Sequence, residues 1–242
     1  MSAASPARTR PASAYGRARS PAATAYVIAV LTVVIVASGL DVVGAHADPA
    51  WRVPLYSAVL TWAASFARFV PGADGDAFAN PVGYVIIPVL LIALFGLRWS
   101  DLGLGPFRRA GLRTALIWLT IGVLIVAAVV ASRFDVPGHV AGRLISNLTT
   151  NGFSEEILFR GLLLGTLAPV LGALRANVVQ AAAFGLWHFG LDVRLAHGNV
   201  LGALGLGLLL QGTVALLMGV ITLRTGNVVV ASLLHDALDT IP

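Results

Sequence analysis

One apolar stretch decides both the fold and the chemistry of this chain, residues 153–164, with the sequence Phe-Ser-Glu-Glu-Ile-Leu-Phe-Arg-Gly-Leu-Leu-Leu. It holds the only glutamates of the chain, Glu155 and Glu156, and Arg160 follows four residues after the second. Ionisable side chains are costly at bilayer depth, and those that occur there usually serve a function. A carboxylate pair in such a stretch therefore indicates a functional site within a membrane helix.

The composition of the whole chain supports a membrane protein. Hydrophobic residues make up 57% and charged residues 11% of the 242 residues, and the mean hydropathy is +0.87. Soluble domains carry about 25% charged residues. The net charge of +5 comes from arginines scattered between apolar runs, which favours a role in membrane orientation and argues against nucleic acid as a partner. The absence of cysteine excludes disulfides and thiol chemistry.

The apolar runs predict an all-α fold, a polytopic transmembrane helix bundle with about seven or eight spans. Each run approaches or reaches the roughly 20 residues that a helix needs to cross a bilayer. Seven runs are predicted to cross, and they cover residues 22–40, 82–97, 112–131, 144–170, 176–189, 200–223 and 228–241.

An eighth run, residues 51–70, is interrupted by Arg52, Pro54 and Arg68. If it does not cross, six arginines share the side of the basic N-terminal segment, as the positive-inside rule prefers. These six are Arg98, Arg108, Arg109, Arg113, Arg175 and Arg224. We therefore expect seven crossings, with 51–70 interfacial or re-entrant and eight crossings as the alternative. The protein is expected in the cell membrane, with its N-terminus in the cytoplasm.

The chain divides into three parts by composition. Residues 1–24 read as a disordered basic leader, because they are rich in Ala, Ser, Pro and Arg and contain no acid. Residues 25–143 are expected to hold the N-terminal transmembrane helices and the interfacial segment, and residues 144–242 to form the functional transmembrane core around the acidic pair. The pattern Ala45-His46-Ala47 could be a signal-peptidase site, but the long spans that follow favour an uncleaved anchor.

Polar residues interrupt three of the C-terminal spans at compatible depths, about half a bilayer from one face. They are the acidic pair with Arg160, then His188, then His235 with Asp239. On a helix, Glu156 and Arg160 are i, i+4 neighbours that can form an ion pair and leave Glu155 facing elsewhere. His235 and Asp239 have the same spacing. A glutamate base with two imidazoles is a complete set for hydrolysis.

The spacing Glu155-Glu156-x-x-x-Arg160, Phe184-x-x-x-His188 and His235-x-x-x-Asp239 resembles the three motifs of the CPBP intramembrane proteases, which include the CAAX prenyl endopeptidases. The resemblance implies an intramembrane endopeptidase acting on a polypeptide, prenylated or membrane-associated. It implies that Glu155 and His188 activate water, that His235 and position 239 form the oxyanion site, and that Glu156 and Arg160 hold the helices. Many members have Asn where this chain has Asp239, and an ionised Asp cannot donate a hydrogen bond.

Other interpretations stay open at the level of sequence. The glutamates could occupy a first helical turn after Ser154, where acids favour the helix dipole. The same side chains could serve a non-enzymatic membrane protein, either a proton-coupled transporter or a scaffold. The leading interpretation needs no cofactor. A metal-dependent form is the alternative, in which zinc is bound by ligands drawn from Glu155, His188, His235 and Asp239.

Three further residues receive secondary predictions. Asp192 is expected in a solvated loop pair with Arg194, and Asp236 is expected to face water or the helix end. Trp187, next to His188, is expected mainly as a packing or interfacial aromatic residue, with a place in the cavity wall as the alternative.

Overall fold

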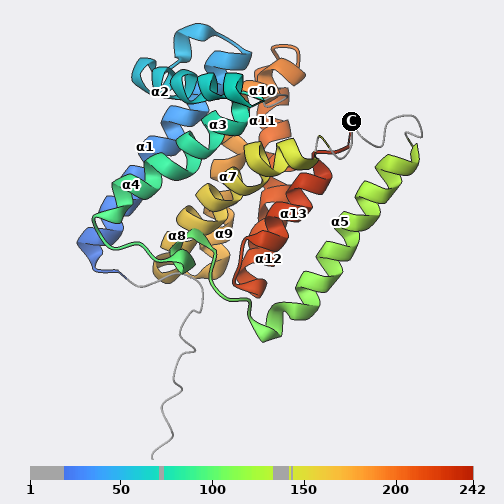
Figure 1. Ribbon diagram of the computed structural model, residues 1–242. Coiled ribbons are helices and arrows are strands. Elements are labelled where there is room, and N and C mark those ends of the chain that lie inside the picture. Colours follow the sequence, from blue (N-terminus) through green and yellow to red (C-terminus); the bar gives the residue numbers. More distant parts are fainter. Residues whose placement is uncertain (1–18, 71–73, 133–141, 143, 242) are drawn as a thin grey trace, which may run out of the picture.

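The computed structural model describes residues 19–70, 74–132, 142 and 144–241 (Figure 1). Within these ranges every regular element is helical and no strand occurs. The all-α prediction is therefore confirmed for the part of the chain that the structure describes.

The N-terminal half begins with the long helix α1 (Pro21–His46) and ends with α5 (Leu112–Ser132). Between them, α3 (Asp76–Asn80), η3 (Pro81–Ile86) and α4 (Ile87–Ala93) form one continuous rod, in which η3 is a π-helical stretch. The shorter elements are η1 (Pro49–Trp51), α2 (Pro54–Ala64), η2 (Ser65–Phe69), η4 (Trp99–Leu102) and η5 (Arg109–Gly111).

The C-terminal half contains the helix with the glutamates, which is continuous from residue 144 to Leu171. It comprises η6 (Leu148–Gly152), α7 (Phe153–Glu156), η7 (Ile157–Leu163) and α8 (Leu164–Leu171), and η6 and η7 are π-helical. The remaining elements are α9 (Ala173–Trp187), α10 (Phe189–Leu195), α11 (Val200–Gly205), η8 (Leu206–Gln211), α12 (Gly212–Thr225) and α13 (Val229–Leu238).

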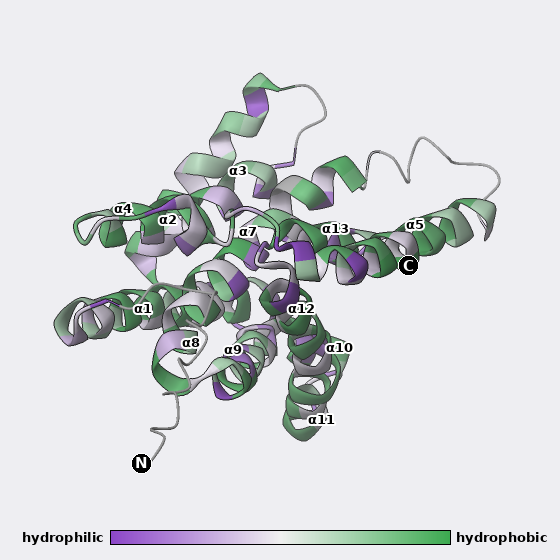
Figure 2. Ribbon diagram, turned by 90° about the horizontal axis from the view of Figure 1, so that it is seen from below, coloured by the Kyte–Doolittle hydropathy of each residue, from purple (hydrophilic) through white to green (hydrophobic). Residues whose placement is uncertain are grey.

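Four described helices are long and apolar enough to cross a membrane, namely Pro21–His46, Asp76–Ala93, Arg109–Ser132 and Val200–Thr225. Large apolar side chains on them are exposed, among them Val33, Val123 and Leu209. Figure 2 shows that the ribbons of α1, α4, α5 and α11 are predominantly hydrophobic. Such a surface suits contact with lipid chains. A membrane protein with several crossings agrees with these features, while the number seven stays a prediction.

The doubtful segment 51–70 is divided into short helices. Helix α2 has 11 residues and runs directly into the 3-10 turn η2, so that the helical stretch covers residues 54–69. In Figure 1, α2 runs crosswise at the end of the bundle where α3 and α10 also lie. The stretch 54–69 is not among the four described helices that are long and apolar enough to cross a membrane.

The N-terminal boundary differs from the prediction. Helix α1 begins at Pro21, within the segment expected to be disordered, because Ser20 caps it. The Ser20 hydroxyl accepts a hydrogen bond from the Ala23 amide at 3.3 Å, and Pro21 suits the first helical turn. The rest of the predicted leader, residues 1–18, lies outside the described residues.

The glutamate-bearing helix lies at the centre of the bundle, with all seven residues of η7 buried. Its apolar side chains belong to a core cluster that also includes residues of α1, α4 and α9, such as Leu31, Ile92 and Phe184. A second cluster joins α5, α12 and α13. The central helix therefore packs against other helices on several of its faces. Its glutamates contact His188 at the end of α9 and His235 on α13.

Candidate active site

The acidic motif lies within a long helix and not at its beginning. Gly152 has φ −53° and ψ −46°, and Asn147 is helical as well, so the chain is already helical before Glu155. The interpretation of the glutamates as a first-turn cap is therefore wrong. The π-helical stretches η6 and η7 flank them on both sides, and such widened turns occur often at functional sites.

Glu156 is held by two cationic or potentially cationic groups. Its Oε1 atom lies 3.0 Å from a guanidinium nitrogen of Arg160, as the i, i+4 spacing predicts, and 3.0 Å from Nδ1 of His235. Glu156 and Arg160 are fully buried. The Arg160 guanidinium also lies 4.3 Å above the ring centre of Phe184, a cation–π contact. Glu156 thus connects the central helix to α13.

Glu155 is buried as well, but it is oriented differently. Its Oε2 atom lies 3.9 Å from Nε2 of His188 and 4.0 Å from Nε2 of His235. Among the described residues this oxygen has no hydrogen-bond partner. The two neighbouring glutamates therefore have different surroundings, since one is in an ion pair and the other faces two imidazoles.

The ring of His188 is oriented by the backbone of its own helix. Its Nδ1 atom lies 3.0 Å from the carbonyl oxygen of Phe184. A carbonyl oxygen can only accept, so Nδ1 carries the hydrogen and Nε2, directed at Glu155, has a free lone pair in the neutral ring. The ring also contacts those of Phe184 and Trp187, with centres 4.5 and 4.8 Å apart.

Asp239 completes the group of six residues predicted from sequence. One of its carboxylate oxygens lies 3.8 Å from Nε2 of His235, and its side chain is 31% exposed. The structure thus brings together Glu155, Glu156, Arg160, His188, His235 and Asp239. Their roles in catalysis stay predictions. The contact of His235 with Glu156 was not predicted, because sequence spacing pairs His235 with its own helix neighbour.

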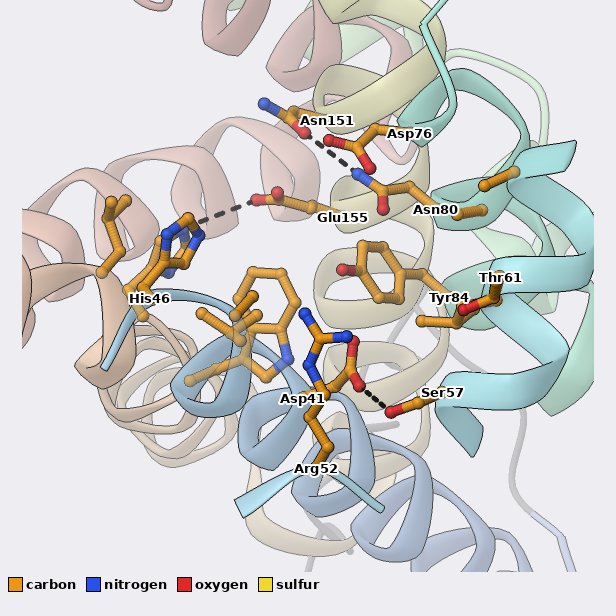
Figure 3. A pocket seen from close by; sticks show the side chains of 18 residues that line it. Asp41, His46, Arg52, Ser57, Thr61, Asp76, Asn80, Tyr84, Asn151 and Glu155 are labelled. Carbon is orange, nitrogen blue, oxygen red and sulfur yellow. Dashed lines mark hydrogen bonds and ion pairs between the residues drawn. The ribbon is translucent and has the colours of Figure 1, made fainter. Parts of the chain in front are cut away.

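A polar cavity of about 440 Å³ leads to Glu155 and His188 (Figure 3). Its walls come largely from the N-terminal half, and the sequence analysis assigned none of these residues to the site. The polar members are Asp41, His46, Arg52, Ser57, Thr61, Asp76, Asn80, Tyr84 and Asn151. No shared motif or spacing in the sequence marks these residues, so the sequence alone does not reveal that they face Glu155.

Several contacts order the cavity wall. Ser57 donates a hydrogen bond to Asp41, which joins α2 to α1, and Asn80 donates one to Asn151 at 3.3 Å. Figure 3 shows the ring of Tyr84 directed into the cavity on the side of Glu155. The wall is therefore built by contacts between separate helices.

The secondary predictions had mixed outcomes. Trp187 lines the cavity and is packed, since its indole donates a hydrogen bond to Ser38 at 2.7 Å. Asp192 is 1% exposed on α10, so the solvated pair is wrong, and burial raises its pKa to about 6. Asp236 is also buried and borders an apolar groove beside α5, contrary to the prediction. Both sit on helix faces that tertiary packing covers.

The spacing of the site bears on zinc. Two ligands of a tetrahedral zinc ion are about 3.3 Å apart. In this site Oε2 of Glu155 lies 3.9 Å from Nε2 of His188 and 4.0 Å from Nε2 of His235. Nε2 of His235 lies 3.8 Å from a carboxylate oxygen of Asp239. Among the described residues, no group of three or more histidines and acids is arranged to hold a metal ion. Glu155, His188, His235 and Asp239 would have to approach one another to become ligands.

Comparison with known proteins gives one family match, in the C-terminal part of the chain. The family model of the type II CAAX prenyl endopeptidase Rce1-like proteins matches residues 137–241, which include all six residues of the site. No curated protein and no solved structure matches the chain. The match confirms the resemblance drawn from the three motifs, and the family implies a protease with a polypeptide substrate in a membrane. The match over residues 137–241 supports the CPBP/CAAX protease family for this part of the chain.

Proposed function

We propose that this protein is an intramembrane endopeptidase in which Glu155 activates the attacking water. The observation that carries the proposal is the contrast between the two glutamates. Glu156 is bound by Arg160 and His235, whereas Oε2 of Glu155 faces two imidazole nitrogens at 3.9 and 4.0 Å at the inner end of a polar cavity. A general base needs an available carboxylate beside its water, and Glu155 is that group.

The tautomer of His188 supports a defined position for the water. With Nδ1 bonded to the Phe184 carbonyl, Nε2 accepts a hydrogen bond. A water between Glu155 and His188 donates one hydrogen to each of them, and its lone pair is then free to attack. Glu155 takes the first proton as the water oxygen bonds to the substrate carbonyl carbon.

In this proposal His235 stabilises the negative charge that forms on the carbonyl oxygen. Its Nδ1 atom donates to the Glu156 carboxylate, so its Nε2 atom can donate to an oxyanion only when the ring is an imidazolium. Carboxylates of Glu155, Glu156 and Asp239 surround this ring. The tetrahedral intermediate then collapses, the carbon–nitrogen bond breaks, and Glu155 returns its proton to the leaving nitrogen.

Glu156 and Arg160 act as positioning residues in this proposal. Arg160 balances the charge of Glu156 in the core, and Glu156 in turn fixes the ring of His235. Phe184 supports both sides of the site, because its ring lies under the guanidinium and its carbonyl orients His188.

The experiment uses the full-length protein in lipid vesicles and a pool of quenched fluorogenic peptides in water enriched in oxygen-18. Hydrolysis predicts products with one oxygen-18 atom in each new carboxyl terminus, together with complementary free amines. The Glu155→Gln variant should form such products at least about 100-fold more slowly. The absence of such products from the wild-type protein would contradict the proposal and favour the transporter or scaffold interpretation.

A further inference from the structure

Arginines are concentrated at one of the two ends of the helix bundle. The end of the bundle where α1 and α5 begin is here called the leader end. Two contacts hold its segments together: Arg19 pairs with Asp101 at 3.1 Å, and the Arg108 amide donates a hydrogen bond to the Thr225 carbonyl at 2.8 Å. Seven arginines belong to this end, namely Arg19, Arg98, Arg108, Arg109, Arg113, Arg175 and Arg224. The chain before Arg19 contains three more arginines and no acid.

The opposite end, here called the cavity end, is where α1 finishes and α2, α3 and α10 lie (Figure 1). Four aspartates belong to its described loops and helix ends, Asp41, Asp48, Asp74 and Asp76, and so do the arginines Arg52, Arg68 and Arg194. The sequence between α5 and the central helix adds Arg133, Arg143 and Asp135. Short loops rich in arginine stay in the cytoplasm, and the difference between the two ends is large. By the positive-inside rule, the leader end is expected on the cytoplasmic side.

The catalytic cavity opens at the cavity end. Its rim includes exposed residues at the finish of α1, on α2 and at the start of α3, such as His46, Thr61 and Asp76. Its inner surface is formed by buried residues, Tyr84, Glu155 and Trp187. A substrate segment in water thus has access from the side away from the arginines.

We propose, building on the endopeptidase function above, that the substrate is a polypeptide segment on the non-cytoplasmic side of the membrane. The lining of the cavity fits a polar, extended chain, because carboxylate, guanidinium, hydroxyl and amide groups line its route to Glu155. Asp41, Arg52 and Asn80 can pair with backbone and side-chain groups of such a segment. The class of substrate is therefore a secreted polypeptide or the outer part of a membrane protein.

Cysteine labelling tests the orientation, because the chain has no cysteine of its own. Thr61→Cys marks the rim of the cavity, and Ser100→Cys marks an exposed position at the leader end. A maleimide that cannot cross membranes should label the first in sealed right-side-out vesicles and the second only in inverted vesicles. The reverse pattern would overturn the inference.

The sidedness of turnover separates this inference from the proposed function. The quenched peptide pool is added outside right-side-out vesicles and, in parallel, outside inverted vesicles that hold the wild-type protein. We expect cleavage in the right-side-out vesicles at least ten times that in inverted ones, and only background with Glu155→Gln in both. Cleavage confined to inverted vesicles would overturn the inference and leave the peptidase function standing. Absence of cleavage in both would contradict the peptidase function itself.

Discussion

The Nδ1 atom of His235 lies 3.0 Å from Oε1 of Glu156, although 79 positions separate the two residues in the chain. The same oxygen lies 3.0 Å from the guanidinium of Arg160. One carboxylate atom therefore ties α13 to the central helix and sets the ring of a candidate catalytic histidine. The two adjacent glutamates consequently differ in what their removal should do.

Glu156→Gln should lower both stability and turnover. The change removes the carboxylate charge that the buried Arg160 guanidinium faces at 3.0 Å, and breaking such a pair costs about 3–5 kcal/mol. It also weakens the contact that orients His235. Thermal unfolding in detergent and peptide turnover measure the two effects. A variant as stable as the wild type would show that this ion pair does not hold the helices together.

Gly161→Ala should destabilise the bundle by about 1–3 kcal/mol, because overfilled packing strains the backbone. A Cβ atom at this position would overlap the carbonyl group of Leu102, which belongs to the η4 turn packed on the central helix. Gly205→Ala is the matched control, since a Cβ atom there meets no neighbour within 4 Å. Equal unfolding temperatures for the two variants would show that η4 does not need this close approach.

The buried carboxyl of Asp192 predicts a pH-dependent contribution to stability. Burial raises its pKa from 3.8 to about 6, so the folded protein holds this proton more tightly than the unfolded chain. The contribution of Asp192 to stability is therefore most favourable below pH 4 and falls as pH rises from about 4 to about 6. Asp192→Asn should raise the unfolding temperature at pH 7.5 and change it little at pH 4. An equal effect at both pH values would contradict this account.

Asp239→Asn separates the oxyanion interpretation from the metal-dependent one. In the metal-free mechanism an amide can donate a hydrogen bond to the oxyanion, so activity should be kept or raised and chelators should have little effect. A zinc site predicts weaker metal binding and lower activity in the variant. Peptidase activity of both forms is measured with and without chelator. The metal-free mechanism would be rejected if the Asn variant lost peptidase activity and if a chelator inhibited the wild type in a way that added zinc reversed.

The sequence predicted the parts of the fold and site that follow from local spacing. The run 112–131 corresponds to α5, because an uninterrupted apolar segment of this length has one stable form in a membrane. The ion pair of Glu156 and Arg160 follows from helix geometry. The six residues of the site were found because ionisable groups are rare in such helices.

Long-range packing accounts for what the sequence did not reveal. Asp192 and Asp236 look like solvated residues in the sequence, but neighbouring helices cover them. The cavity wall around Asn80 and Tyr84 depends on how the N-terminal helices meet the central one. No spacing along the chain encodes such contacts.

The most direct test of the central claim is the turnover of Glu155→Gln in lipid vesicles, measured with the quenched peptide pool. Loss of a general base lowers the rate by about 10²–10⁴-fold. Because Glu155 makes no ion pair with Arg160, the variant should keep the unfolding temperature of the wild type. Wild-type turnover by a folded Glu155→Gln protein would contradict the assignment of Glu155 as the catalytic base.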